Sequence, residues 1–158
     1  MPKITYITPL FAVAGQLDAK DFAQLAAMGI KSVINNRPDG ESGVLVGSDE
    51  AAECAKRAGL NYRYAPITNH AVLDRGAVDD SEEALRALPG PILAYCRTGN
   101  RSSILWAQVA ARYNSAEATL RASKDAGLDL DFLRPELEQI SRDHGARSKE
   151  DELVNQAA

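Results

Sequence analysis

Residues 91–113 read PILAYCRTGNRSSILWAQVAARY, an apolar run followed by one cysteine, a short basic loop and a helical pattern. The apolar run from Pro91 to Tyr95 is typical of a strand buried on both faces of a parallel sheet. From Ser102 onward apolar residues recur at helical spacing, and Ser102 is available as the helix cap. A strand, a loop and a helix in this order place the loop at the carboxyl edge of a sheet, where a helix N-terminus attracts anions.

Cys96 is the candidate nucleophile of this loop. The helix N-terminus and the guanidinium groups of Arg97 and Arg101 favour its thiolate form. Gly99 lets the loop turn with backbone donors pointing inward, and Arg101 offers a planar fork that can hold an oxyanion. An inert cysteine buried at a strand end would not require two arginines and a glycine beside it. The residues expected to bind the anion around Cys96 and Arg101 are Arg97, Thr98, Gly99, Asn100 and Ser102.

The motif C-R-T-G-N-R-S resembles the active-site loop of rhodanese-type sulfurtransferases and of cysteine-dependent phosphatases. Four residues separate Cys96 from Arg101, as in the rhodanese C-x4-R pattern, whereas the phosphatases carry C-x5-R. A shorter loop encloses a smaller cavity, which suits one sulfur atom better than a phosphoryl group. The resemblance therefore implies, first, a sulfurtransferase that carries a persulfide on Cys96. The alternatives are a phosphatase that forms a cysteinyl-phosphate and a non-catalytic module that senses anions or persulfides.

The composition limits the classes of protein and partner. A chain of 158 residues with a net charge of −4 and no long apolar span predicts a soluble domain over residues 1–145 that binds neither nucleic acid nor membrane. Residues 146–158 are expected to form a flexible tail. The two cysteines do not make a disulfide framework, so the prediction is a reducing, cytoplasmic location, with Cys54 in the core. No spacing of metal ligands is present, and no cofactor is expected.

The rest of the chain alternates helical and strand patterns. This alternation predicts an α/β fold with three layers, in which helices flank a mostly parallel central sheet. The loops after Asn36, Ile67 and Tyr95 should then meet at one edge of the sheet. Further strands are expected at 4–7, 11–14, 31–36 and 61–67, and further helices at 19–28, capped by Asp18, 48–58, 79–88, from 114 and over 136–144.

The N-terminal half resembles dual-specificity phosphatases, in the stretches FAVAGQLD (11–18), GIKSVINNRPDGE (29–41) and GLNYRYAPI (59–67). In particular, residues 3–135 are similar to the phosphatase-like domain of beta-lactamase hydrolase-like proteins. This resemblance implies a cysteine-phosphatase-like fold and either phosphatase or sulfurtransferase activity. It also implies functional pairing with a sulfur-oxidising enzyme of the metallo-hydrolase fold. The expected substrate is a small anion, either a sulfur donor such as thiosulfate or a persulfide, or a phosphoester.

The resemblance also marks a departure at the general acid. Related phosphatases place an aspartate in the loop after the strand that ends here at Ile67, whereas this chain has a histidine, His70, and then Asp74. Either is a substitute acid, or a plain surface residue of the loop. Arg37 follows a strand toward the same edge and is expected either to bind the anion or to pair with a nearby carboxylate, Asp39 or Glu41. The resemblance implies that the Ser102 hydroxyl donates a hydrogen bond to the thiolate.

Overall fold

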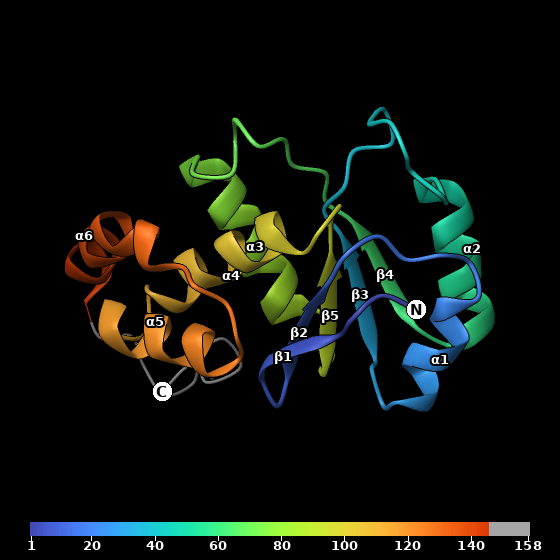
Figure 1. Cartoon of the computed structure of the whole chain (residues 1–158), viewed down its shortest axis with the longest axis horizontal. Helices are drawn as coiled ribbons and strands as arrows, with labels where there is room; N and C mark the ends of the chain where they lie inside the picture. The colour runs from blue at the N-terminus through green and yellow to red at the C-terminus, as the bar shows by residue number, and fades with distance from the viewer. Residues whose placement is uncertain (146–158) are drawn as a thin grey trace.

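A computed structural model describes residues 1–145 and contains one five-stranded sheet between helices (Figure 1). The strand order is β1-β2-β5-β3-β4; β1 pairs antiparallel with β2, and the remaining neighbours are parallel. This confirms the expected three-layer α/β fold. The strands are β1 (Thr5–Thr8), β2 (Phe11–Ala14), β3 (Ser32–Asn35), β4 (Asn61–Tyr64) and β5 (Ile92–Tyr95). The helices are α1 (Asp21–Ala27), α2 (Ser48–Ala58), α3 (Arg75–Ala87), α4 (Asn100–Ala110), α5 (Ala116–Asp125) and α6 (Arg134–His144), with a 3₁₀ turn at Asp131–Leu133.

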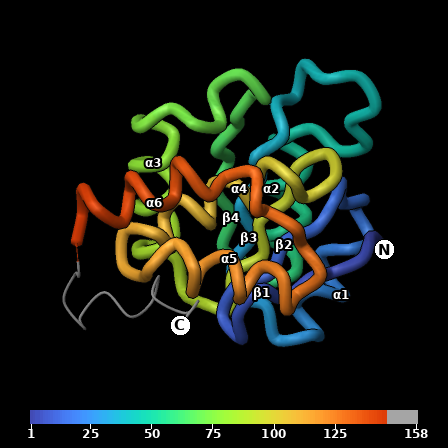
Figure 2. The backbone as a smooth tube through the Cα atoms, turned by 60° about the vertical axis from the view of Figure 1, so that its left-hand side comes forward, coloured from blue at the N-terminus to red at the C-terminus, as the bar shows by residue number. Residues whose placement is uncertain are grey.

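The central strand β5 divides the core into two halves because successive side chains of a strand face opposite sides of a sheet. Ile92 and Ala94 pack with α3 and α4, whereas Leu93 and Tyr95 pack with α1 and α2. All four residues are buried, as the continuous apolar run predicts. Helices α5 and α6 pack against α4, and Figure 2 shows them in front of it.

Helix α4 is the most enclosed helix of the fold. Every residue from Arg101 to Ala110 is buried, and the helix contacts α3, α5 and α6. Such a helix, enclosed on all sides, belongs to the interior of a domain. Trp106 on this helix stacks on Phe11 of β2, with ring centroids 5.9 Å apart. The helix that follows the cysteine loop is therefore fixed by packing along its whole length.

Helix α4 also begins earlier than its sequence pattern indicates. Its first residue is Asn100, and the capping position is Gly99 in the left-handed region with φ +94°. The expectation that Ser102 caps the helix is therefore wrong. Ser102 is already inside the first turn, and its hydroxyl donates to Asn36 Oδ1 at 2.8 Å.

Other element boundaries shift for local reasons. Helix α1 begins at Asp21, because the Asp18 N–H donates to Asp21 Oδ2 at 2.7 Å and Asp18 closes a turn before the helix. Strand β4 ends at Tyr64, two residues before Pro66, which cannot donate to a neighbouring strand. Helix α3 begins at Arg75, four residues before the expected start. Helix α2 has the expected bounds, and Gly59, with φ +77°, caps its C-terminus.

The fold brings three connecting segments to one end of the sheet. Figure 1 shows the segments after β3 and β4 rising at the end where β5 leads into α4. Within residues 1–145 no helix is long and apolar enough to cross a membrane. The same part of the chain holds no cluster of residues suited to a metal ion. The expected tail, residues 146–158, lies outside the described residues.

Candidate active site

The loop from Cys96 to Arg101 curls around the cysteine sulfur. Cys96 is 1% exposed, and the Gly99 N–H donates to its Sγ at 3.1 Å. The loop is pressed against the end of β2, since a Cβ on Gly99 would lie 3.3 Å from the Ala14 carbonyl oxygen. The segment after β2 also contacts the loop, because the Gln16 N–H donates to the Arg97 carbonyl at 3.2 Å. The structure therefore has the inward-facing backbone donor that the sequence predicts.

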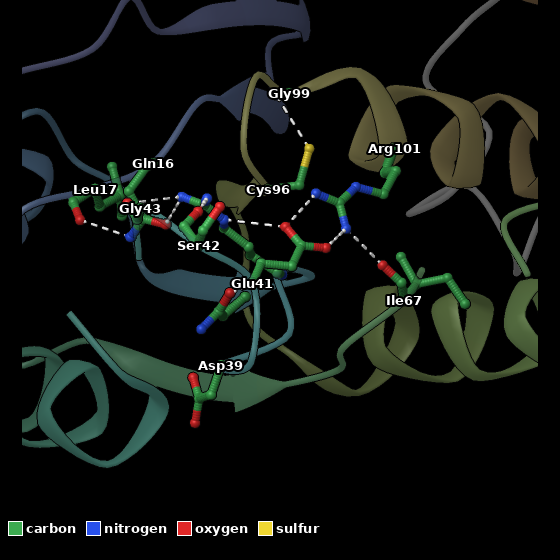
Figure 3. A network of polar contacts seen from close by, with 12 residues as sticks. Gln16, Leu17, Asp39, Glu41, Ser42, Gly43, Ile67, Cys96, Gly99 and Arg101 are labelled. Carbon is green, nitrogen blue, oxygen red and sulfur yellow. Dashed lines mark hydrogen bonds and ion pairs between the residues drawn. The ribbon is translucent and has the colours of Figure 1, made fainter. Parts of the chain in front are cut away.

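Arg101 lies beside the cysteine and is held by a carboxylate from another loop. Its Nη1 donates to Glu41 Oε2 at 2.6 Å and to the Ile67 carbonyl at 2.8 Å, and its Nη2 donates to Glu41 Oε1 at 2.9 Å (Figure 3). Arg101 itself is 4% exposed. This bidentate contact fixes the plane of the guanidinium, because both terminal nitrogens are engaged by one carboxylate.

Glu41 and Ile67 leave a second fork of Arg101 unused, and the Cys96 side chain, which also raises the pKa of Arg101, interacts with this guanidinium. A guanidinium has five N–H donors, and Glu41 and Ile67 take three of them. The remaining two, one on Nε and one on Nη2, lie side by side on the adjacent edge. Figure 3 shows the guanidinium between the Glu41 carboxylate and the Cys96 side chain. An oxyanion bonded to the cysteine sulfur would be within the reach of this edge.

The electrostatics keep Glu41 and Arg101 charged. The hydrogen bonds that Arg101 donates to Glu41 raise the pKa of Arg101, and burial opposes them. Hydrogen bonds from Arg101 hold the pKa of the Glu41 carboxyl below its usual value, against the opposing effect of burial and with the help of Arg37. A carboxylic acid with a lowered pKa is a poor proton donor near neutral pH. Glu41 is thus suited to orienting Arg101 and not to protonating a leaving group.

Arg37 is buried, and all three of its guanidinium nitrogens donate hydrogen bonds to protein atoms. Its Nε lies 3.2 Å from Glu41 Oε1, which is the ion pair given above as one alternative for Arg37. Its Nη1 donates to Gln16 Oε1 at 2.7 Å, and its Nη2 donates to the Ser42 carbonyl at 2.6 Å. At 4% exposure, Arg37 holds the loop that carries Glu41. Direct binding of the substrate anion by Arg37 stays a prediction that these contacts do not favour.

Two other residues near the site differ from their expected contacts. The single hydroxyl hydrogen of Ser102 goes to Asn36 Oδ1, so Ser102 does not donate to the thiolate in this arrangement. Asn36 in turn donates from Nδ2 to the Ala65 carbonyl at 2.9 Å. The carboxylate of Asp39, the other candidate partner of Arg37, accepts the Ser48 N–H at the start of α2 instead.

The remaining candidate residues are exposed. Arg97, Thr98 and Asn100 are exposed on the outside of the loop, where Thr98 Oγ1 accepts the Asn100 N–H at 3.4 Å. His70 and Asp74 are exposed in the segment between β4 and α3. This segment follows Ile67, whose carbonyl touches Arg101, so it lies next to the site. Their role as general acids stays a prediction.

Two residues of the site were missed by reasoning from sequence. The sequence offers Glu41 only as a partner of Arg37, whereas in the structure its carboxylate also binds Arg101. Gln16 lies in the stretch FAVAGQLD after β2, but glutamine is not a residue type that suggests chemistry.

Comparisons with known proteins give relatives of the same fold. A solved structure from Neisseria meningitidis, which carries a provisional phosphatase name, is 29% identical, covers 87% of this chain and 97% of its own, and has a TM-score of 0.75. Kinase associated phosphatase shares the fold, with a TM-score of 0.69 over 93% of this chain and 98% of its own at 15% identity. The neighbours thus favour the phosphatase alternative over sulfur transfer, which none of them shows.

The curated relatives are longer proteins. A beta-lactamase hydrolase-like protein of Xylella fastidiosa is 32% identical over 105 residues, which are 66% of this chain and 24% of that protein. The chain therefore corresponds to about a quarter of this relative. The family described as the phosphatase-like domain of beta-lactamase hydrolase-like proteins matches residues 3–113. With the cysteine loop, the arginine fork and this match together, the chain belongs to that family.

Proposed function

We propose that this domain hydrolyses phosphoesters through a cysteinyl-phosphate on Cys96. The observation that carries the proposal is the pair of donors aimed at one place: the Gly99 N–H at 3.1 Å from Sγ and the free Nε and Nη2 edge of Arg101. Donors placed where negative charge develops stabilise a transition state without reorganisation. Membership of a phosphatase-like family supports the same chemistry.

The reaction proceeds in two steps. The Cys96 thiolate attacks the phosphorus atom, the bond from phosphorus to the leaving oxygen breaks, and that oxygen departs with the electron pair. Water then attacks the cysteinyl-phosphate, the S–P bond breaks, and inorganic phosphate and the thiolate are released. The fork of Arg101 holds two equatorial oxygens throughout. His70 or Asp74, in the neighbouring segment, supplies the proton for leaving groups that need one.

Sulfur transfer is the second candidate, and the four-residue spacing between Cys96 and Arg101 favours it. The thiolate would attack the outer sulfur of thiosulfate, the S–S bond would break, and sulfite would leave with the electron pair. The resulting Cys96 persulfide would pass its outer sulfur to an acceptor thiolate. This route needs no general acid, because sulfite leaves unprotonated.

The test compares the two substrates on one protein. We expect 4-nitrophenyl phosphate to be hydrolysed by the chain and by Cys54→Ala, which removes the other cysteine, but not by Cys96→Ser. Mass spectrometry after incubation with thiosulfate should show no added sulfur. A sulfur adduct on Cys96 that dithiothreitol removes, together with slow phosphate turnover, would reverse the order of the two candidates. A protein that does neither is a binding module, and both proposals fail.

A further inference from the structure

A closed ring of contacts joins the two sides of the cysteine loop through residues outside it. It begins at the Arg97 carbonyl, which accepts the Gln16 N–H at 3.2 Å. The Gln16 side chain accepts from Arg37 at 2.7 Å, and Arg37 donates to Glu41 at 3.2 Å. Glu41 then binds both terminal nitrogens of Arg101 and returns the ring to the loop (Figure 3).

We propose that Gln16 and Arg37 are positioning residues, which hold Glu41 so that the free fork of Arg101 faces an oxyanion on Cys96. The inference rests on the proposed function, because it assigns a purpose to that fork. Neither residue touches the expected substrate position. Both act through the Glu41 carboxylate, whose Oε1 is shared between Arg37 at 3.2 Å and Arg101 at 2.9 Å.

The amide of Gln16 is oriented by its own contacts. Its Nε2 donates to the Leu17 carbonyl at 2.9 Å, which leaves Oε1 to accept from Arg37. Arg37 is held from a second direction by the carbonyls of Ser42 at 2.6 Å and Gly43 at 3.3 Å. One buried guanidinium thus binds the end of β2 and the loop of Glu41 together. The backbone of Gln16 meanwhile ties that strand end to the cysteine loop.

The ring is useful because an oxyanion needs donors fixed to within a fraction of an ångström. Arg101 has a long side chain, and a carboxylate on a loop can fix it only if the loop is itself fixed. Glu41 follows a turn and its side chain is 29% exposed, so the loop depends on Arg37 for its position. The ring therefore fixes the position of Glu41 relative to the end of β2, and the same strand end contacts the cysteine loop.

The test uses tungstate, a tetrahedral oxyanion, as the probe and calorimetry as the readout, so it requires no turnover. Gln16→Met removes the side-chain acceptor without a change of charge, and we expect tungstate to bind about three- to tenfold more weakly. Gln108→Met is the matched control. Its amide is buried and donates to two carbonyls, those of Val72 and Ile104, whereas the half-buried Gln16 donates to one; because Gln108 lies outside the ring, its replacement should leave tungstate affinity unchanged.

Two further variants separate positioning from general stability. Arg37→Lys keeps the charge but loses the planar fork, so it should weaken tungstate binding as Gln16→Met does. It therefore tests the inference even if Gln16→Met folds poorly. In a Glu41→Gln background the effect of Gln16→Met should be smaller, because the amide keeps only one of the two oxygens that link Arg37 to Arg101. Unchanged affinity in Gln16→Met, an equal loss in Gln108→Met, or a full effect in the Glu41→Gln background would each overturn the inference. A wild-type chain that binds no tungstate would instead overturn the proposed function.

Discussion

Replacing Glu41 with glutamine tests the charge balance of the site directly. The substitution keeps the shape of the side chain and one acceptor oxygen but removes the only carboxylate that contacts Arg37 and Arg101 in the described structure. Both guanidinium groups are almost fully buried, whereas the Glu41 side chain is 29% exposed. The cost should lie between that of breaking an exposed pair, roughly 0–1 kcal/mol, and a buried one, roughly 3–5 kcal/mol. We expect a loss of about 2 kcal/mol, or about 4–8 °C in Tm.

The pH dependence gives this prediction its sign. The pKa of Glu41 in the folded protein lies below its usual value of 4.5, because Arg101 and then Arg37 bind the charged form against burial. Its ion pairs therefore stabilise the fold fully above pH 4.5, and this contribution is lost as the pH falls through the folded pKa. The difference in the free energy of unfolding between wild type and Glu41→Gln should accordingly be largest near neutral pH and shrink in acid.

The assay is urea denaturation followed by circular dichroism between pH 3 and pH 8. The matched control is Glu117→Gln, since Glu117 also pairs with two arginines, Arg121 and Arg134, but is 61% exposed. Its loss should stay below about 0.5 kcal/mol. A Glu41→Gln variant as stable as wild type at pH 7, or one whose deficit is the same at every pH, would refute the assigned role of this carboxylate.

Two further predictions concern the cysteine loop. Arg101→Lys should lower kcat/KM for a phosphate ester about tenfold to a hundredfold, whereas Arg97→Lys, at an exposed position, should change it less than about threefold; equal losses would mean that the arginines act through charge alone. Gly99→Ala should lose about 1–2 kcal/mol of stability and most turnover, because φ is +94° and the new Cβ would lie 3.3 Å from the Ala14 carbonyl. Gly29→Ala, at φ +96° with open space around it, should lose similar stability and keep its turnover.

The fold could be predicted from sequence because its determinants are local. The continuous apolar run before Cys96 predicts a strand buried on both faces, and all four residues of β5 are buried. Gly59 marks the end of α2 at the observed residue. The boundaries that were wrong depend on contacts between elements or on backbone angles. Ser102 looks like a cap in sequence, but Gly99 takes that position and Ser102 bonds instead to Asn36 after β3.

The site could be predicted only in part for the same reason. Cys96, Gly99 and Arg101 lie close together in sequence, so their spacing is enough to predict the active-site loop. Glu41 lies 60 residues from Arg101, and no local pattern marks the pairing between them. The preference for sulfur over phosphate rests mainly on the length of the loop, together with the missing aspartate after Ile67. The comparisons favour the phosphatase alternative, because the architecture around the loop is shared with phosphatases.

The burial of α4 has a consequence for the motions of the protein. A helix with no exposed residue between Arg101 and Ala110 cannot open without disrupting the packing of α3, α5 and α6. Its amide hydrogens should therefore exchange with solvent only through global unfolding, on a timescale far slower than any turnover. The C-terminal end of the cysteine loop is rigid as well, because Arg101 lies in the first turn of α4. Any movement that admits substrate or releases product is then expected in the exposed segment between β4 and α3 that carries His70, because Arg37 and Gln16 hold the loop of Glu41 in place.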